Sequence, residues 1–407
     1  MILLSHPTAN QNVRQAALAF AEDDLLAEFW TCLNWKEDSF LDRHFPARLR
    51  NELRRRSFSD RVKPFTRTVP WREAGRLLSQ QLGLQFLTRS ETGVFSVDAV
   101  YLSLDRHVAR RLRDSSQIKA VYAYDHGALE SFRAAKSRGL RCIYEHPIVY
   151  WREARRLQQE EAELHPEWKS TLGAIHDSEK KLARKDAELA LADVVIVPST
   201  FSKNSLSQAP GLKAPVQVVP YGAPSVSHAS GESRSGKLAV LFVGALSQAK
   251  GLKYLLEAAA KLERQIDLTL IGKRVSPLIP TAAMLDKHRW IPSLAYDDLL
   301  REMARQDVLV LPSLHEGFGL VIGEAMAQGL VVIATPHTAA PDLIEDGVDG
   351  FIIPIRSAEA IAEKLELLRH DPARLGEMKQ AARRKAKIHS WEAYRRTLVR
   401  LAREVVS

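Results

Sequence analysis

The sequence has 407 residues, of which 45% are hydrophobic and 26% are charged, and this composition excludes disordered and fibrous proteins. The chain is long enough for two domains that each bury a core. Its two cysteines, Cys32 and Cys142, are too few for a disulfide framework and favour a reducing compartment. A formal net charge of +9 indicates anionic partners, such as nucleotide diphosphates or an acidic membrane surface.

The first residues of the chain predict a strand of the fold. Residues 1–5 are apolar but lack the basic flank and long core of a signal peptide. No stretch of the sequence reaches the roughly 20 apolar residues that a membrane span needs. We therefore expect a cytoplasmic protein that can bind peripherally to the inner face of a membrane.

Apolar runs alternate with helical stretches along the whole chain, which predicts an α/β fold of two doubly wound, Rossmann-like domains. The strands predicted for the first half are residues 2–5, 120–124, 142–145 and 194–198. A charged, helix-rich stretch covers residues 150–191. Residues 223–236 are rich in Ser, Gly, Ala and Pro and are the predicted linker, so the first domain would comprise residues 1–222.

The second predicted domain comprises residues 237–385. Its predicted strands are residues 239–243, 268–271, 308–311, 331–334 and 351–354. A basic helical stretch from 371 to 406 closes the chain.

Basic residues cluster around positions 48–63, 106–113 and 383–387. The aromatic residues Phe58, Phe65 and Trp71 accompany the first cluster, a combination that can also bind nucleic acid. Solvated helix faces and docking to an anionic membrane surface are the two interpretations that stay open. We expect no nucleic-acid partner.

Two glutamates, Glu316 and Glu324, are the most informative residues of the second half. They flank the turn Gly317-Phe318-Gly319, which follows a predicted buried strand and precedes a predicted helix that starts at Leu320. The glycines let the backbone come close to a ligand. The start of the helix presents free N–H groups to an anion, typically a phosphate. Carboxylates on both sides are strong acceptors for sugar hydroxyls.

This run resembles the E-x7-E signature of the retaining glycosyltransferases of family 4. The resemblance implies the GT-B fold, with a last helix, residues 386–407, that crosses back to the N-terminal domain. It also implies that Glu316 contacts the donor sugar and that Glu324 binds the ribose of the nucleotide, with Gly317, Phe318, Gly319 and Leu320 around the phosphates. An ordinary strand-turn-helix with solvated glutamates is the alternative interpretation.

Residues 242–251 resemble the strand-loop segment in which this family holds the donor diphosphate with an Arg and a Lys. Lys250 matches the Lys, but Ala245 stands at the Arg position. Neutralising a leaving diphosphate is a main source of catalysis, so we expect another cation, Lys273 or Arg274, to compensate. Solvated side chains remain the alternative for all three basic residues.

Three further residues are candidates by their place in the sequence. Trp290 lies where the family binds the nucleotide base, although a core position is the more usual one for a tryptophan. Asn10 follows the first strand and could bind a sugar or cap a helix. His146 ends a strand at the edge where α/β sheets bind ligands, and it resembles the family's histidine near the reacting sugar. We favour it over the pair Asp125-His126, with a packing role left open.

The predicted function is a retaining, metal-independent hexosyltransferase that moves a sugar from a UDP or GDP sugar to a hydroxyl acceptor, such as a growing glycan or a lipid-linked sugar. Its catalytic residues would be Glu316, His146 and Lys250. We expect no cofactor and no metal, because the sequence has neither an Asp-x-Asp triplet for a metal-nucleotide complex nor spaced histidine ligands. An epimerase or hydrolase of the same fold and a non-catalytic nucleotide-sugar-binding protein are the alternatives.

Overall fold

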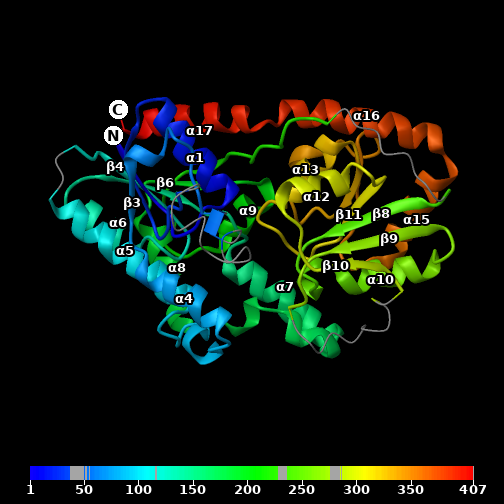
Figure 1. The fold of residues 1–407 in the computed structure, drawn as a ribbon, viewed down its shortest axis with the longest axis horizontal. Coiled ribbons are helices and arrows are strands. Elements are labelled where there is room, and N and C mark those ends of the chain that lie inside the picture. Colours follow the sequence, from blue (N-terminus) through cyan, green and yellow to red (C-terminus); the bar gives the residue numbers. More distant parts are fainter. Residues whose placement is uncertain are drawn as a thin grey trace.

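The computed structural model describes residues 1–36, 50, 53–54, 56–114, 117–227, 236–275, 285 and 287–406. Two α/β domains lie side by side, and the last two helices run across both of them (Figure 1). The predicted fold class is therefore confirmed. Arg48 and Arg55 of the first basic cluster, and residues 228–235 of the predicted linker, lie outside the described residues.

The N-terminal domain is built on a parallel sheet with the order β3-β2-β1-β4-β5-β6-β7 among the described residues. Its strands are β1 (Ile2–Ser5), β2 (Leu26–Thr31), β3 (Thr66–Thr68), β4 (Ala120–Tyr124), β5 (Arg141–Glu145), β6 (Val194–Val197) and β7 (Val216–Val218). The inner strands β1, β4 and β6 are wholly buried, as strands covered on both faces should be. The sequence did not predict β2, β3 and β7, because these outer strands are partly exposed and lack a continuous apolar run.

Helices cover both faces of this sheet. The helices of this domain are α1 (Gln11–Glu22), α4 (Trp71–Gln81), α5 (Val97–Arg113), α6 (Leu129–Lys136), α7 (Trp151–Leu164), α8 (Glu179–Leu191) and α9 (Thr200–Ser205), with the short 3₁₀ helices η1 (Lys63–Phe65), η2 (Gln85–Thr88), η3 (Pro166–Thr171), η4 (Ala174–His176) and η5 (Leu206–Gln208). Successive strand residues point to opposite faces. Accordingly Leu3 packs in the core under α5 and α6, whereas Ile2 and Leu4 pack in the core that α1 joins.

The C-terminal domain has a parallel sheet with the order β10-β9-β8-β11-β12-β13 among the described residues. Its strands are β8 (Leu238–Val243), β9 (Ile266–Ile271), β10 (Arg289–Ile291), β11 (Val308–Leu311), β12 (Val331–Ala334) and β13 (Gly350–Ile352). The helices around it are η6 (Gln248–Lys250), α10 (Leu252–Lys261), α12 (Tyr296–Met303), α13 (Leu320–Gln328), α14 (Ala340–Leu343) and α15 (Ala358–His370). Only β10, a three-residue strand at the edge of the sheet, was not predicted.

The closing helical stretch consists of α16 (Pro372–Ile388) on the C-terminal domain and α17 (Trp391–Val406) on the N-terminal domain. The helix α16 packs against α13, and α17 packs against α1 (Figure 1). Arg395 of α17 donates a hydrogen bond to Gln15 of α1 at 2.6 Å, and Arg403 pairs with Asp23 at 2.6 Å. The chain crosses from one domain to the other between Ile388 and Trp391.

A second bridge joins the domains through α7 and η3. The wholly buried Glu161 of α7 accepts hydrogen bonds from Gln248 (2.6 Å), Tyr254 (2.7 Å) and Arg356 (2.7 Å) of the C-terminal domain. Trp168 of η3 packs in the core of that domain. A buried carboxylate that has three donors is stabilised in place, so this contact fixes how the two domains meet.

Candidate active site

A cavity of about 770 Å³ lies between the two domains, a size typical of sites for small molecules. Residues that follow β1, β4 and β5 line one wall, and residues that follow β8 and β11 line the other. The carboxyl ends of both sheets therefore face the same space, where ligands of open α/β sheets bind. Several candidate residues from the sequence line this cavity, namely Asn10, Lys250, Glu316, Gly317, Phe318, Gly319, Leu320 and Glu324.

The turn before α13 gives the C-terminal wall its anion-binding character. Gly319 has a φ of +84°, which favours glycine, and the helix starts at the next residue. Leu320 and Val321 of the first turn line the cavity. The unpaired N–H groups and the positive end of the helix dipole thus lie at the cavity wall, where they can stabilise a phosphate.

Gly317 lets the backbone approach the N-terminal domain and not a ligand, which is the role that the sequence predicts for the glycines of this turn. A Cβ atom at this position would lie 1.9 Å from the carbonyl oxygen of Pro147 in the N-terminal domain. The carbonyl oxygen of Gly317 accepts hydrogen bonds from Ser199 (2.6 Å) and Ser202 (2.9 Å). The close approach is therefore to the other domain, and it ties the turn to the opposite wall.

Lys250 and Glu316 form an ion pair, and Ser313 donates to Glu316 Oε1 at 3.1 Å. A Cβ atom at Gly251 would lie 2.0 Å from the carbonyl oxygen of Pro312, so the turn of η6 packs directly on the segment after β11. The structure thus brings these two predicted residues together. Their side chains are 27% and 14% exposed, so little solvent screens the pair.

Glu324 lies one turn into α13 and lines the cavity. Burial raises the pKa of its carboxyl to about 7, and a hydrogen bond with the hydroxyl of Tyr296 opposes part of this rise. The carboxyl is therefore partly protonated near neutral pH. Its ionised form is the stronger acceptor for hydroxyl groups.

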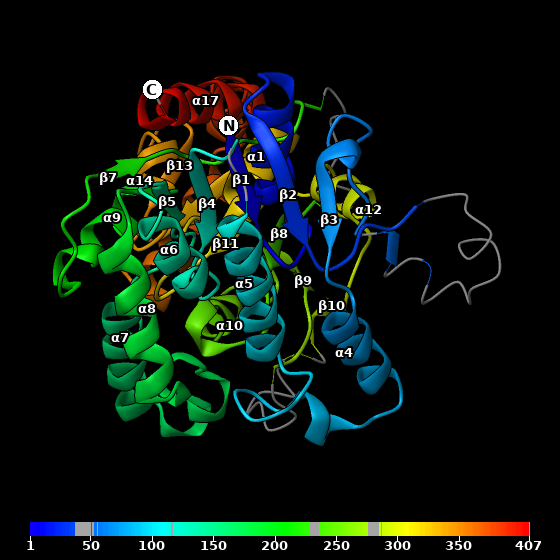
Figure 2. The ribbon, with the colours of Figure 1, turned by 90° about the vertical axis from the view of Figure 1, so that its left-hand side faces the viewer.

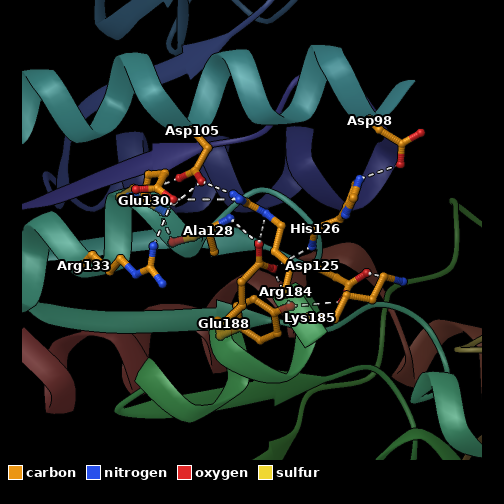
Figure 3. Close-up of polar contacts among 12 residues, drawn as sticks. Asp98, Asp105, Asp125, His126, Ala128, Glu130, Arg133, Arg184, Lys185 and Glu188 are labelled. Atoms are coloured by element: carbon orange, nitrogen blue, oxygen red, sulfur yellow. Dashed lines mark hydrogen bonds and ion pairs between the residues drawn. The ribbon is translucent and has the colours of Figure 1, made fainter. Parts of the chain in front are cut away.

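The N-terminal wall is organised by the turn after β4. His126 has a φ of +73°, which is rare outside glycine. Glu188 of α8 holds this turn, because it accepts the backbone N–H groups of His126 (2.8 Å) and Ala128 (3.2 Å) (Figure 3). Glu188 is wholly buried, and burial together with the charge of Asp125 raises its pKa to about 8.

Paired charges cover the same wall. Asp98 of α5 contacts the ring of His126 (2.9 Å) and the ammonium group of Lys181 (3.2 Å). Asp125 contacts Lys185 at 3.3 Å. All five side chains line the cavity (Figure 3 shows Asp98, Asp125, His126 and Lys185). Alternating donors and acceptors of this kind can bind sugar hydroxyls.

The structure places His146 beneath this wall. Its side chain is 2% exposed and stacks on Tyr144, with Nδ1 3.3 Å from Asp125. It does not line the cavity, although the next two residues, Pro147 and Ile148, do. In the structure it is thus His126, the less favoured choice from the sequence, that faces the cavity.

The cavity is also lined by five residues that were not predicted from the sequence, namely His6, Asp98, Tyr101, Lys181 and Lys185. Burial lowers the pKa of His6 to about 4, so its ring is neutral near pH 7. Its place directly after the first strand was the one available signal. The others lie within helices and have no motif around them.

Lys273, Arg274 and Trp290 do not line the cavity. The two basic side chains are exposed, and the guanidinium group of Arg274 lies 4.2 Å from the ring centroid of Trp290. Trp290 donates to the carbonyl oxygen of Gly272 at 2.9 Å and is only half-buried, so it is an edge-strand residue. Asn10 does line the cavity, and its Oδ1 accepts from Thr8 at 3.1 Å instead of capping the helix.

Within the described residues, no group of three or more His, Cys, Asp and Glu side chains could hold a metal ion. The described helices include none with the length and apolarity to cross a membrane.

Solved structures resemble the whole chain. Sucrose-phosphate synthase from Thermosynechococcus elongatus matches 99% of this chain and 98% of its own, with a TM-score of 0.69 and 18% identity. HepE from Anabaena, solved in complex with UDP-glucose, matches 99% of both chains with a TM-score of 0.61 and 17% identity. The chain has the GT-B fold.

The sequence comparisons concern the second half. Residues 226–386 match the family model described as glycosyl transferases group 1. The D-inositol 3-phosphate glycosyltransferase of Arthrobacter sp. (strain FB24) is 35% identical over 170 residues, which are 39% of this chain and 40% of the relative. The chain thus matches about two fifths of this curated relative's length.

Proposed function

We propose that the protein is a retaining glycosyltransferase of family 4, which moves a hexose from a UDP or GDP sugar to a hydroxyl acceptor without a metal ion. The observation that carries the proposal is the Lys250–Glu316 ion pair beside the start of α13, in a cavity between two Rossmann-like domains. The matched family model and the relative's name support sugar transfer over the two alternatives.

The C-terminal domain, residues 237–385, would bind the donor. Lys250 and the first turn of α13 stabilise the diphosphate, and Glu324 accepts hydrogen bonds from the ribose. When the diphosphate draws Lys250 away, Glu316 is released to orient the donor sugar. Opposite charges in a half-buried site attract each other strongly, so a bound diphosphate competes well for Lys250.

The reaction breaks the bond between the anomeric carbon and the phosphate oxygen and forms one to the acceptor oxygen on the same face. The acceptor proton passes to the leaving phosphate. Charge develops on that phosphate, where the helix start and Lys250 offset it. Lys273 or Arg274, whose exposed side chains lie outside the cavity lining, would turn toward the diphosphate to complete the set of cations in the absence of an Arg at position 245. His146 would support the reacting centre through Asp125.

The N-terminal domain, residues 1–222, would bind the acceptor, with residues 223–236 as the linker and the final helix returning from the C-terminal domain. The paired charges around His126 suit a sugar with several hydroxyl groups. A growing glycan or a lipid-linked sugar fits this wall, in a cytoplasmic protein that binds the inner face of a membrane. No cofactor is involved.

A transfer assay tests the proposal. The full chain is incubated with UDP and GDP sugars, with and without simple sugar acceptors, in EDTA. We expect an acceptor-dependent product whose anomeric configuration, read by NMR, is that of the donor. A product that forms equally without acceptor would point to the hydrolase or epimerase, and activity restored only by manganese or magnesium would exclude metal independence.

The compensating cation has its own test. Lys273→Ala or Arg274→Ala should lower turnover by roughly 10²–10³-fold if that side chain stabilises the leaving phosphate. Adding Ala245→Arg to the affected variant should recover part of the rate. Normal turnover in both single variants would exclude compensation.

A further inference from the structure

Exposed apolar surface concentrates in one short segment of the N-terminal domain. Among the described residues, half of the large hydrophobic side chains that are exposed lie between positions 71 and 97. They are Trp71 (50%), Leu78 (57%), Leu82 (62%), Leu84 (37%), Phe86 (70%), Val94 (45%) and Val97 (53%). Large exposed apolar patches mark interaction sites, whereas single exposed side chains need no explanation.

The helix α4 turns its apolar stripe to solvent. Trp71, Ala74 and Leu78, together with Leu82 at the helix end, follow one another at intervals of three and four residues, and all four are exposed. This is the spacing of one helix face. The other side of the helix buries Leu77. Figure 2 shows α4 at the lower edge of the molecule, far from both termini, so no described element covers this stripe.

The charge of the segment suits an anionic surface. Residues 66–97, from β3 to the start of α5, contain four basic and two acidic residues. Both acidic side chains are engaged, because Glu73 is buried against Arg56 and Arg76, and Glu91 accepts hydrogen bonds from Ser178. The exposed basic residues of this range are Arg67 and Arg89. A helix with exposed apolar residues and surrounding basic residues is typical of proteins that lie in the headgroup region of an anionic bilayer.

The exposed segment continues to the cavity. Val97 belongs to it and also lines the cavity, as does Ser90, which lies between Phe86 and Val94. The exposed Ile148, in the loop after β5, lines the cavity too. An amphiphile could therefore keep its tail in a bilayer beneath α4 while its polar head reaches the wall around His126.

We propose that the α4 face, formed by Trp71, Leu78, Leu82, Leu84, Phe86 and Val94, docks on an anionic phospholipid bilayer. Its apolar side chains enter the headgroup region, and the surrounding basic residues bind lipid phosphates. The delivery of a lipid-linked acceptor to the cavity rests on the proposed function, and the docking names the surface through which the protein would bind the membrane proposed there.

Vesicle sedimentation tests the docking. The full chain, without nucleotide sugar, is mixed with vesicles of phosphatidylglycerol and phosphatidylcholine or of phosphatidylcholine alone. We expect binding to the anionic vesicles that weakens as salt is raised. The triple variant Leu78→Ser/Leu82→Ser/Phe86→Ser should partition onto them about tenfold less, because three apolar side chains no longer leave water.

The matched control is the triple variant Leu164→Ser/Val348→Ser/Ile388→Ser, which changes exposed apolar residues outside the α4 face. It should bind vesicles like the natural chain. Both variants should keep the natural circular dichroism spectrum and nucleotide affinity, because all six positions are exposed and lie outside the cavity wall.

Failure of the natural chain to bind anionic vesicles, or equal loss in both triple variants, would overturn the proposal. So would an α4-face variant that binds vesicles normally but dissociates a dimer in sedimentation velocity, since the occupant would then be a second copy of the chain. None of these outcomes touches sugar transfer, which is measured with soluble acceptors.

Discussion

The two walls of the cavity take their charged residues from different kinds of sequence segment. The C-terminal wall draws on two short segments, the turn at Lys250 and the run from Glu316 to Glu324, and each is a strand end followed by a glycine turn. The N-terminal wall draws on α5, the turn after β4, and α8, with Glu188 holding that turn from below. The first wall is thus encoded locally, whereas the second exists only once distant helices pack together.

The difference predicts different consequences of substitution. Residues on the C-terminal wall are expected to affect donor binding and turnover. The charged residues behind the N-terminal wall are expected to affect the stability of the fold first.

Lys250→Ala should have the largest effect on turnover. Removing one preorganised cation from a leaving phosphate costs about 10²–10³-fold in kcat. Initial rates at saturating donor measure it. Lys253→Ala is the matched control, because this lysine pairs with Glu257 along α10 and lies outside the cavity lining, and its turnover should be unchanged. Normal turnover in the Lys250 variant would show that the diphosphate does not bind next to Lys250.

Glu324→Ala should weaken nucleotide binding. Each charge-assisted hydrogen bond that is lost to the ribose costs about 1.5–3 kcal/mol. Calorimetric titration with the bare nucleotide gives the affinity. Glu345→Ala, at a carboxylate outside the cavity lining, serves as the control. Equal affinity in the Glu324 variant and the natural chain would show that the ribose lies elsewhere.

Glu188→Ala should lower the free energy of unfolding by about 1–3 kcal/mol, because it leaves the backbone N–H groups of His126 and Ala128 without their acceptor. Urea unfolding measures the change. Glu163→Ala replaces an exposed glutamate of α7 and should stay within about 0.5 kcal/mol of the natural chain. If the Glu188 variant is as stable as the natural chain, the turn after β4 does not depend on the hydrogen bonds to Glu188.

The affinity for UDP-glucose should rise with pH. The pKa of Glu324 is raised to about 7, so its carboxyl is mostly protonated at pH 6 and mostly ionised at pH 8. If the ribose binds the ionised form, affinity rises by about tenfold across this interval, because the ionised fraction does. A nucleotide sugar is used since its diphosphate does not titrate there. Glu324→Gln should abolish the dependence, and a dependence that persists in this variant would assign it to another group.

The sequence predicted what local patterns encode. Buried inner strands such as β4 and β11 have continuous apolar runs, and the glycine turn at Gly319 directly precedes the helix that it starts. Outer strands such as β3 have no such run. The preference for His146 over His126 could not be corrected from the sequence, because the backbone of His126 is held by Glu188, 62 residues away in the chain.

The bridge between the domains through α7 and η3 could not be predicted from the sequence either. Trp168 belongs by sequence to the first half, but it packs in the core of the second domain. Nothing in its neighbourhood along the chain indicates this, since the partners that bury it come from residues beyond position 237. Long-range packing of this kind depends on the final position of η3 against the C-terminal domain.

Calorimetric titration of the natural chain with UDP, GDP and ADP tests the central claim most directly, namely that the cavity between the domains binds a nucleotide diphosphate. The account predicts saturable one-to-one binding of UDP or GDP in EDTA, with ADP weaker. The absence of binding by all three nucleotides would contradict it.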